Sequence, residues 1–444
     1  MKPLPDPLEI PSGVIAEGVV RPPGSKSLTN RAVLLAALAR GTTTVRNALA
    51  SEDTEVMRRA LVQLGVPVQQ TDGGALLIRG VGGVFPASEA NIFVANSGTT
   101  IRFLTAALAA APSGTYRLYG VPRMHERPIG ELVAALRELG ADIEFEQRTG
   151  YPPLTIHARG LRGGEIDIHG SVSSQFLSGI LMAAPLARGP ITIRLIGPLV
   201  SAPFVTLTTR LMERFAVSVA SHWLVPPTEA GRVPQGTPVA EFRVTPAGYR
   251  PCELTIEPDA TAASYFWGAA AITGGCVTVP GLGPQALQGD VRFVHFLEQM
   301  GATITSEADS IAVHGGKLKG IDADLCAVSD TAPTLAVVAL FAQGKTRLSG
   351  LTHTRHQETD RVHALATELR RLGARVQEQT DGITIQPGRL TAAIIETYND
   401  HRIAMAFALA GLRVPGVAIR NPSCTAKTYP DYWDDLFRLL RPKG

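Results

Sequence analysis

The sequence predicts an α/β protein of two similar domains, with three repeated units in each. Three observations predict this fold class. An alanine- and leucine-rich stretch recurs six times, each copy ends at a turn, and a β-branched stretch follows each turn. Glycines mark the turns at intervals of 69 to 86 residues: Gly41, Gly114, Gly189, Gly275, Gly344 and Gly416. Recurrence at such an interval is typical of a repeated supersecondary unit.

Each repeat begins with an apolar stretch that is long enough for a buried helix, and glycine ends it before a strand. These stretches start at Arg31, Ile101, Phe176, Ser264, Thr334 and Ile403. A second helix follows, as in Glu131–Gly140, and its apolar residues at i, i+3 and i+4 leave one face for solvent. Strands come next, for example at Ala141–Phe145 and Gly301–Thr305. The predicted unit is therefore helix, strand, helix and one or two strands.

The longest interval between turn glycines separates the third copy from the fourth. It contains a proline- and glycine-rich segment, Val225–Glu241, without helix or strand periodicity, which we interpret as a surface loop. We expect the domain boundary soon after it, near Ala247–Pro251, with three units on either side. A single six-unit solenoid and a coincidental similarity of the copies are the alternatives, and six copies in order make coincidence improbable.

Composition excludes several classes of protein. Of the 444 residues, 45% are hydrophobic and 18% are charged, so the chain is neither disordered nor fibrous. A net charge of +3 without basic runs makes nucleic acid a poor candidate partner. The longest apolar runs are too short to span a bilayer, and the first residues lack the apolar core of a signal peptide. We therefore expect a cytoplasmic protein with no membrane partner.

Motifs for metals and nucleotides are also missing from the sequence. The four cysteines form no C-x-x-C pair, and the ten histidines show no metal-binding spacing, so we expect buried reduced thiols and no metal. Gly24-Ser25-Lys26-Ser27 lacks the spacing of a phosphate-binding loop. Gly281–Ala286 matches G-x-G-x-x-A but lacks the acidic residue that a dinucleotide site requires.

Polar segments precede all six buried helices, and they are where the sequence indicates chemistry. They span residues 24–31, 95–102, 170–176, 257–264, 329–334 and 397–402. Helix capping, worth about 1 kcal/mol, accounts for one side chain per helix, yet each segment supplies three or four. Several also place a cation where the helix dipole disfavours it: Lys26, Arg31, Arg102 and Arg402. A bound anion would remove this conflict, so helix starts that face one cleft would hold one or two strongly anionic ligands.

Nine segments spread over nearly the whole chain resemble the family of 5-enolpyruvylshikimate-3-phosphate synthases. They are PPGSKSLTNRAVLLAALA, NSGTTIRF, PRMHERPIGELVAALRELGA, YPPLTIH, GSVSSQFLSGILMAAPLA, QGDVRF, ETDR, YNDHRIAMAFAL and CTAKTYPDY. The resemblance implies two domains of three βαβαββ-type units with buried helices, an inside-out α/β barrel. It divides the chain into residues 25–248 and residues 1–24 with 249–444, with the active site in the cleft between them.

The resemblance also implies a 3-phosphoshikimate 1-carboxyvinyltransferase of the shikimate pathway, which leads to chorismate and the aromatic amino acids. The 5-hydroxyl of shikimate 3-phosphate attacks C2 of phosphoenolpyruvate, and the tetrahedral intermediate then loses phosphate. The family needs no cofactor, its partners are these two small molecules, and glyphosate occupies its phosphoenolpyruvate site. We expect a monomer. Because both substrates are anions, arginines are the expected binding groups.

The matching motifs imply roles for individual residues. Asp330, or alternatively Lys26, takes the proton of the 5-hydroxyl, and Glu358 protonates the methylene carbon. The shikimate 3-phosphate contacts fall on Lys26, Ser27, Arg31, Ser173, Ser174, Gln175, Ser201, Asp330 and Gln357. The phosphoenolpyruvate contacts fall on Lys26, Gly98, Arg127, Gln175, Arg361, Arg402 and Lys427. Without the resemblance, a solvated charged turn would be the alternative for Arg127, Arg361 and Lys427.

Four positions depart from the family's pattern. Phe103 replaces a usual proline, Phe204 a tyrosine, His353 an asparagine and Gln357 a lysine. Gln357 can offer only a neutral hydrogen bond, which is about half as strong as a charge-assisted one. We therefore expect weaker binding of shikimate 3-phosphate, unless His353 or His356 supplies the missing charge.

Two other functions compete with this interpretation. UDP-N-acetylglucosamine 1-carboxyvinyltransferase shares the fold and the phosphoenolpyruvate chemistry, but its family carries a reactive cysteine in the loop that reads PRMHERPIG here, and this chain has no cysteine before Cys252. A catalytically silent binding protein is the other alternative, motivated by Phe204, His353 and Gln357. The presence of Lys26, Asp330 and Glu358 argues against a silent binding protein.

Overall fold

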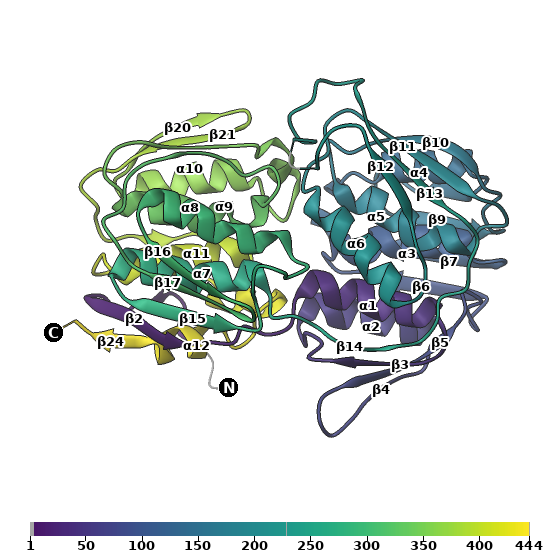
Figure 1. Ribbon diagram of the computed structural model, residues 1–444, viewed down its shortest axis with the longest axis horizontal. Coiled ribbons are helices and arrows are strands. Elements are labelled where there is room, and N and C mark those ends of the chain that lie inside the picture. The colour runs from purple at the N-terminus through teal and green to yellow at the C-terminus, as the bar shows by residue number, and fades with distance from the viewer. Residues whose placement is uncertain (1–3, 228, 444) are drawn as a thin grey trace. The chain divides into compact units, whose positions relative to one another are not determined.

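The computed structural model describes residues 4–227 and 229–443, which form two compact domains. The N-terminal domain is Gly24–Ile256, and the C-terminal domain combines residues 4–23 with residues 257–443. Figure 1 shows the discontinuity directly, because the purple strand β2 (Val14–Val19) lies beside green and yellow elements of the C-terminal domain.

The six sheets share one topology. In each, two strands run parallel: β14 with β3, β6 with β7, β10 with β11, β2 with β15, β18 with β19, and β22 with β23. Four sheets then add two antiparallel strands. The sheet of β2 and β15 adds three, because β24 also pairs antiparallel with β2, and the last sheet adds β1 antiparallel to β23. This repetition confirms the predicted six copies of one α/β unit in two domains.

The N-terminal domain holds three four-stranded sheets. In sheet order their strands are β14 (Glu253–Thr255), β3 (Arg40–Arg46), β5 (Leu76–Val81) and β4 (Val68–Gln70); β6 (Glu89–Phe93), β7 (Gly114–Tyr119), β9 (Leu154–Ala158) and β8 (Asp142–Phe145); β10 (Gly164–His169), β11 (Ile191–Ile196), β13 (Pro238–Val244) and β12 (Ala220–Trp223).

The C-terminal domain holds sheets of five, four and three strands. In sheet order they are β16 (Thr303–Glu307), β17 (Ser310–His314), β15 (Cys276–Pro280), β2 and β24 (Leu440–Pro442); β18 (Asp322–Asp324), β19 (Thr346–Ser349), β21 (Gly382–Gln386) and β20 (Arg375–Gln379); β1 (Leu8–Glu9), β23 (Ala418–Ile419) and β22 (Ile394–Ile395).

Helices alternate between buried and half-buried along the chain, because the first helix of each repeat is apolar on all sides and the second on one. The buried ones are α1 (Lys26–Leu38), α3 (Gly98–Ala110), α5 (Ser174–Ala183), α7 (Ala260–Thr273), α9 (Ala332–Val338) and α11 (His401–Gly411). The others are α2 (Glu52–Gln63), α4 (Gly130–Glu138), α6 (Pro203–Arg214), α8 (Phe293–Met300), α10 (Arg361–Arg371) and α12 (Tyr432–Arg438). Short 3-10 helices are η1 (Pro122–Glu126), η2 (Ala184–Leu186), η3 (Gly289–Arg292), η4 (Ser329–Thr331), η5 (Ala339–Phe341), η6 (Thr352–His356) and η7 (Pro422–Lys427).

The chain leaves the N-terminal domain later than the sequence indicates. The predicted boundary at residues 248–249 falls before β14, yet β14 pairs in parallel with β3, from Glu253 opposite Thr44 to Thr255 opposite Arg46. The first repeat of this domain therefore takes its first strand from the far end of the domain. A strand partner about 200 residues away leaves no local signal, which is why the boundary is displaced.

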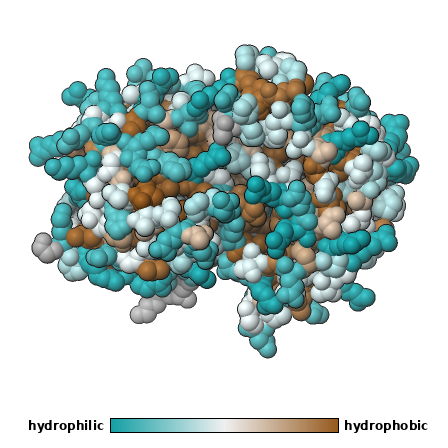
Figure 2. Space-filling model, in the orientation of Figure 1, coloured by the Kyte–Doolittle hydropathy of each residue, from teal (hydrophilic) through white to brown (hydrophobic). Residues whose placement is uncertain are grey.

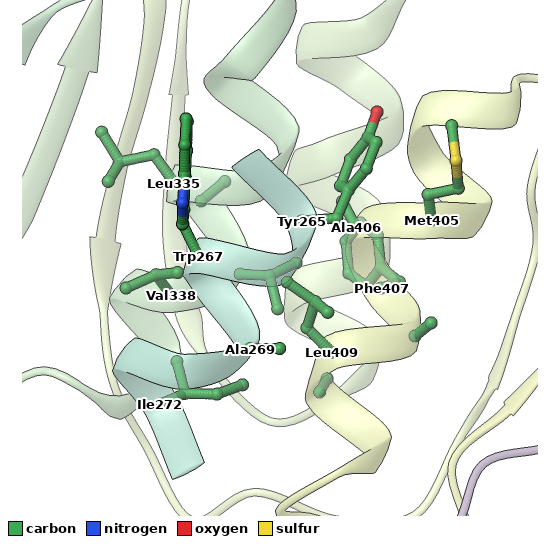
Figure 3. Packing of buried hydrophobic residues seen from close by; sticks show 14 of the residues in the cluster. Tyr265, Trp267, Ala269, Ile272, Leu335, Val338, Met405, Ala406, Phe407 and Leu409 are labelled. Carbon is green, nitrogen blue, oxygen red and sulfur yellow. The ribbon is translucent and has the colours of Figure 1, made fainter. Parts of the chain in front are cut away.

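The core of the C-terminal domain forms where α7, α9 and α11 meet. Figure 3 shows Trp267 of α7 beside Leu335 and Val338 of α9. A Cβ on Gly268 would lie 2.9 Å from the Thr334 methyl group, so α7 and α9 approach too closely for any side chain there. Glycine within a helix costs about 1 kcal/mol relative to alanine, and the close packing accounts for its presence.

Hydrophilic residues cover most of the face in Figure 2. Two details differ from the sequence prediction. The four cysteines are partly exposed rather than buried, since Cys276 begins β15, Cys424 lies in η7, and the other two lie outside helices and strands. The end of the expected loop Val225–Glu241 already belongs to β13, because this stretch pairs with β11 and β12. Within the described residues, no helix has the length and apolarity to cross a membrane.

Candidate active site

Serines cap the three buried helices of the N-terminal domain. The side chains of Ser25, Ser97 and Ser173 accept backbone N–H groups at the starts of α1, α3 and α5. Capping therefore uses one side chain per helix, as the sequence argument allowed. The remaining polar residues of these segments have other partners.

Arg102 joins the starts of α3 and α5. Its guanidinium donates to the Gln175 amide oxygen at 2.7 Å and to the Ser173 hydroxyl at 3.2 Å. The Gln175 amide nitrogen donates in turn to the Thr99 hydroxyl at 3.2 Å. Two predicted contacts, Ser173 and Gln175, are thus held together by Arg102, which was absent from the predicted set. Its signal was present in the sequence, as a cation in the first turns of a helix.

Gly98 lies directly against Arg127. A Cβ at position 98 would overlap one terminal guanidinium nitrogen of Arg127. That guanidinium donates to the Asn96 carbonyl at 3.0 Å and to the Asn96 side-chain oxygen at 3.3 Å, while its buried Nε has no acceptor among the described residues. The bare backbone at the start of α3 therefore adjoins a cation.

Arg31 is buried without a carboxylate partner among the described residues. Its Nε donates to the Thr208 hydroxyl at 2.8 Å, and its terminal nitrogens donate to the Ser27 carbonyl at 3.0 Å and the Ser178 hydroxyl at 3.4 Å. Burial lowers the pKa of Arg31, because desolvation disfavours its charged form. A buried cation of this kind attracts an anionic ligand.

Two departures from the family's pattern contact the same guanidinium. The central carbon of Arg31 lies 4.9 Å from the ring centroid of Phe103 and 5.7 Å from that of Phe204. Both distances fall within the range of cation–π attraction. The two aromatic rings thus flank Arg31. Because they accept none of its N–H groups, they do not compete with an anion for them.

The other predicted residues of this domain begin helices or adjoin them. Lys26 is the first residue of α1, and its ammonium lies 3.8 Å from the carboxylate of Asp53 on α2. Ser174 is the first residue of α5. Ser201 has a left-handed backbone, with φ of 53°, just before α6.

In the C-terminal domain one arginine joins both predicted proton carriers. Arg361, the first residue of α10, donates to Asp330 at 3.1 Å and to Glu358 at 2.9 Å. Arg402 donates to the other oxygen of Asp330 at 2.7 Å, and Lys427 donates to Glu358 at 3.0 Å. The structure therefore brings together all five residues that the sequence predicted in this domain as cations or proton carriers.

Asp400 completes this network, although the sequence analysis did not select it. It caps α11 by accepting the backbone N–H of Arg402 at 2.9 Å, and it accepts Nε of Arg361 at 2.8 Å. Burial would lower the pKa of Arg361, but Asp400 and Glu358 raise it above its ordinary value. Burial would likewise lower the pKa of Arg402, but the negative charge of Asp330 raises it, so the pKa of Arg402 also lies above its ordinary value. Three cations thus face three carboxylates.

Comparison with known proteins identifies the family. The family model for EPSP synthase (3-phosphoshikimate 1-carboxyvinyltransferase) matches residues 12–436. The chain belongs to the EPSP synthase family. A 3-phosphoshikimate 1-carboxyvinyltransferase of Nitrosomonas europaea is 48% identical over 437 residues, covering 96% of this chain and 97% of that protein. One of Nostoc punctiforme is 44% identical, covering 98% and 99%.

Solved structures agree with this assignment. EPSP synthase from Acinetobacter baumannii has a TM-score of 0.79 at 27% identity and covers 98% of both chains. The enolpyruvyl transferase NikO from Streptomyces tendae shares the fold, with a TM-score of 0.76 at 19% identity over 98% of this chain and 99% of its own. As a member of the EPSP synthase family, the chain is a transferase of aromatic amino acid biosynthesis, which moves the enolpyruvyl group of phosphoenolpyruvate to shikimate 3-phosphate. No finding favours the alternative functions.

Gln357 and His353 are the family departures of this domain. The side-chain oxygen of Gln357 accepts a hydrogen bond from Arg361. His353 is buried, and its Nε2 lies 2.9 Å from the Ser329 hydroxyl. Burial lowers the pKa of His353 to about 4, so this residue is neutral at neutral pH and cannot supply the charge that lysine carries in other EPSP synthases.

Asp290, of the QGDVRF segment, is a further buried acid near the network. It accepts a hydrogen bond from the Thr261 hydroxyl at 2.5 Å. Burial, reinforced by the negative charge of Asp330, raises the pKa of Asp290 to about 7. The segment was recognised in the sequence as typical of the family, but its carboxyl was not selected because only the fold brings it near Asp330.

Proposed function

We propose that the two domains supply complementary halves of one active site for the transfer, and that the residues named from the sequence carry it out. One observation supports this most strongly: Asp330 and Glu358, the two predicted proton carriers, bind the same guanidinium, that of Arg361. Two carboxylates placed on one cation can act on two neighbouring atoms of one reaction centre.

The reaction then proceeds in two steps. Glu358 gives a proton to the methylene carbon of phosphoenolpyruvate, while the 5-hydroxyl oxygen of shikimate 3-phosphate bonds to C2 and its proton passes to Asp330 or to Lys26. In the second step the C2–O bond to phosphate breaks, the leaving phosphate takes up the proton held by Asp330 or Lys26, and the new methyl group returns a proton to Glu358 to restore the double bond. Phosphate and the enolpyruvyl ether are the products, so atoms and protons balance.

Binding follows the charges. We assign the carboxylate and phosphate of phosphoenolpyruvate to Lys26, Arg127, Arg361, Arg402 and Lys427, with Gly98 and Gln175 against the same ligand. We assign shikimate 3-phosphate to Lys26, Ser27, Arg31, Ser173, Ser174, Gln175, Ser201, Asp330 and Gln357. Arginine suits both ligands because its planar fork can make two charge-assisted bonds to one carboxylate or phosphate.

A steady-state assay of phosphate release from the two substrates tests the function. The wild-type protein should release phosphate only when both are present. Glu358→Gln and Asp330→Asn should each lower kcat by at least about a hundredfold, in the range that general acid–base groups contribute. Glu307→Gln, the same change on an exposed strand of the same domain, is the control and should leave kcat unchanged. A wild-type protein that releases no phosphate would refute the proposed function.

Small-angle scattering tests the division of the site between domains. Because the ligand's anionic groups must meet cations from both domains, adding the substrates should make the molecule more compact. An unchanged radius of gyration at saturating substrate would contradict the shared site.

We also propose that the chain works as a cytoplasmic monomer, since all the proposed site residues belong to one chain. Sedimentation at micromolar concentration should give the mass of one chain, 47.0 kDa. A stable dimer would contradict this proposal.

A further inference from the structure

Two consecutive residues before α11 have a strained backbone. Tyr398 and Asn399 adopt left-handed conformations, with φ of 53° and 54°, immediately before the capping residue Asp400. This region costs about 1–2 kcal/mol for a residue with a side chain, and only asparagine, aspartate and glycine visit it routinely. Such a turn persists only where the surrounding structure holds it.

Glu368 of α10 holds this turn. One of its carboxylate oxygens accepts the Tyr398 hydroxyl at 2.8 Å, and the other accepts the backbone N–H of Glu396 at 3.2 Å. Arg371 pairs with the carboxylate at 3.0 Å. The side chain of Glu368 is fully buried, so these bonds form away from water and are correspondingly strong.

Helix α10 binds the segment of residues 396–400 at a second position, Asp400. Arg361 precedes Glu368 by seven residues, which is about two helical turns, so both side chains leave the same face of α10. Arg361 binds Asp400 at 2.8 Å, while Glu368 binds Tyr398 and Glu396. The segment from residue 396 to residue 400 is therefore fastened to α10 at two points.

The second point belongs to the charged network. Asp400 joins Arg361 to the start of α11, and Arg402 lies two residues further on and binds Asp330. A shift of the turn at residues 398–399 would move Asp400, and with it the directions of both guanidinium groups.

We propose that Glu368 and Tyr398 are positioning residues, which hold the strained turn so that Arg361 and Arg402 are aimed at an anionic substrate. The proposal rests on the proposed role of these two arginines toward phosphoenolpyruvate. Glu368 and Tyr398 act through Asp400. Positions of cations within a site need an accuracy of better than about 1 Å, and a small misplacement far from the reacting atoms lowers the rate.

The test compares two variants with a matched control. Tyr398→Phe removes one oxygen atom from a partly exposed side chain, so the variant should fold. Glu368→Gln removes the buried charge. Glu396→Gln makes the same change within the turn's own segment and leaves the backbone N–H unaltered. Among the residues that the structure describes, the Glu396 side chain pairs only with exposed Arg420.

We expect the KM for phosphoenolpyruvate to rise about threefold to tenfold in Tyr398→Phe and further in Glu368→Gln. In both variants the dissociation constant of shikimate 3-phosphate, measured by calorimetry without phosphoenolpyruvate, should stay within twofold of the wild type. In Glu396→Gln both this constant and the KM for phosphoenolpyruvate should stay within twofold. An unchanged KM for phosphoenolpyruvate in both variants would overturn the proposal. So would equal weakening of both substrates together with a lower melting temperature, which is the result of a purely structural role. An inactive wild type would refute the proposed function instead, so the two failures are distinguishable.

Discussion

The two proposed half-sites, one in each domain, pair their cations in opposite ways. In the C-terminal domain, Arg361 and Arg402 bind Asp330, and Arg361 also binds Asp400. In the N-terminal domain, Arg31 and Arg127 bind hydroxyl, carbonyl and amide oxygens, and no carboxylate among the described residues pairs with either. One half-site is neutralised from within, and the other is left positive.

The difference teaches where a substrate anion gains most. A buried cation without a counter-ion has lost its hydration, so an anion that reaches it recovers a large part of that cost. A cation that already has carboxylate partners gains less, because the ligand must share or displace them. We therefore expect the N-terminal half-site to be the stronger anion site by itself, whereas the C-terminal network holds its groups in place before any ligand arrives.

Removing a carboxylate from the C-terminal network should have the largest effect. Asp400→Asn keeps a good helix cap, because asparagine caps as well as aspartate, but it leaves buried Arg361 short of one charge. The free energy of unfolding should fall by about 3 kcal/mol or more, the amount that breaking a buried pair costs. Urea unfolding measures it, with Arg127→Gln as the N-terminal control. If both variants lost the same free energy of unfolding, the two half-sites would not differ in how their cations are paired.

Arg127→Gln should instead act on turnover. It removes a cation that makes no ion pair in the described part of the protein, so the free energy of unfolding should fall by no more than about 1–2 kcal/mol, the contribution of its two hydrogen bonds to Asn96. An anion left without its cation should cost about 3 kcal/mol, so kcat/KM should fall at least about a hundredfold. Steady-state assays measure it. Turnover near the wild-type value would show that this cation does not meet the substrate.

The sequence was sufficient for the cations but not for their partners. Lys26, Arg31 and Arg402 are visible because they conflict with the helix dipole, which is a local rule. Asp400, by contrast, looks like an ordinary helix cap, and its pairing with Arg361 spans 39 residues along the chain. Phe103 and Phe204 likewise show as departures, but only the packing of α1, α3 and α6 brings them to Arg31. Repeats and caps are local, whereas counter-ions and strand partners such as β14 depend on topology.

Buried His353 of the C-terminal domain should contribute a loss of stability in acid. Burial lowers the pKa of His353 to about 4 from its ordinary 6.5. As pH falls below 6.5 the unfolded chain takes up this proton while the folded chain does not, so stability is lost from pH 6.5 down through pH 4. Between pH 7 and pH 5 this residue should account for about 2 kcal/mol. Between pH 7 and pH 5 the free energy of unfolding of His353→Asn should therefore fall by about 2 kcal/mol less than that of the wild type. Parallel losses in variant and wild type would contradict the buried, neutral His353.

Gly98→Ala should have the smallest effect of this series. The added methyl group would overlap the Arg127 guanidinium, which is the mobile end of a long side chain and can move aside. We expect the KM for phosphoenolpyruvate to rise about tenfold, equivalent to 1.4 kcal/mol, while the binding of shikimate 3-phosphate stays nearly constant. A change confined to shikimate 3-phosphate would place Arg127 on the wrong ligand.

Calorimetric binding of shikimate 3-phosphate alone, compared between Arg31→Met and Arg402→Met, tests the central comparison most directly. Both changes replace a buried arginine with an uncharged side chain, one in each half-site. If Arg31, which has no carboxylate partner among the described residues, carries most of the binding of this substrate, Arg31→Met should weaken binding about thirtyfold or more, and Arg402→Met less than threefold, with both proteins folded by their melting curves. Equal losses, or a larger loss in Arg402→Met, would contradict the account.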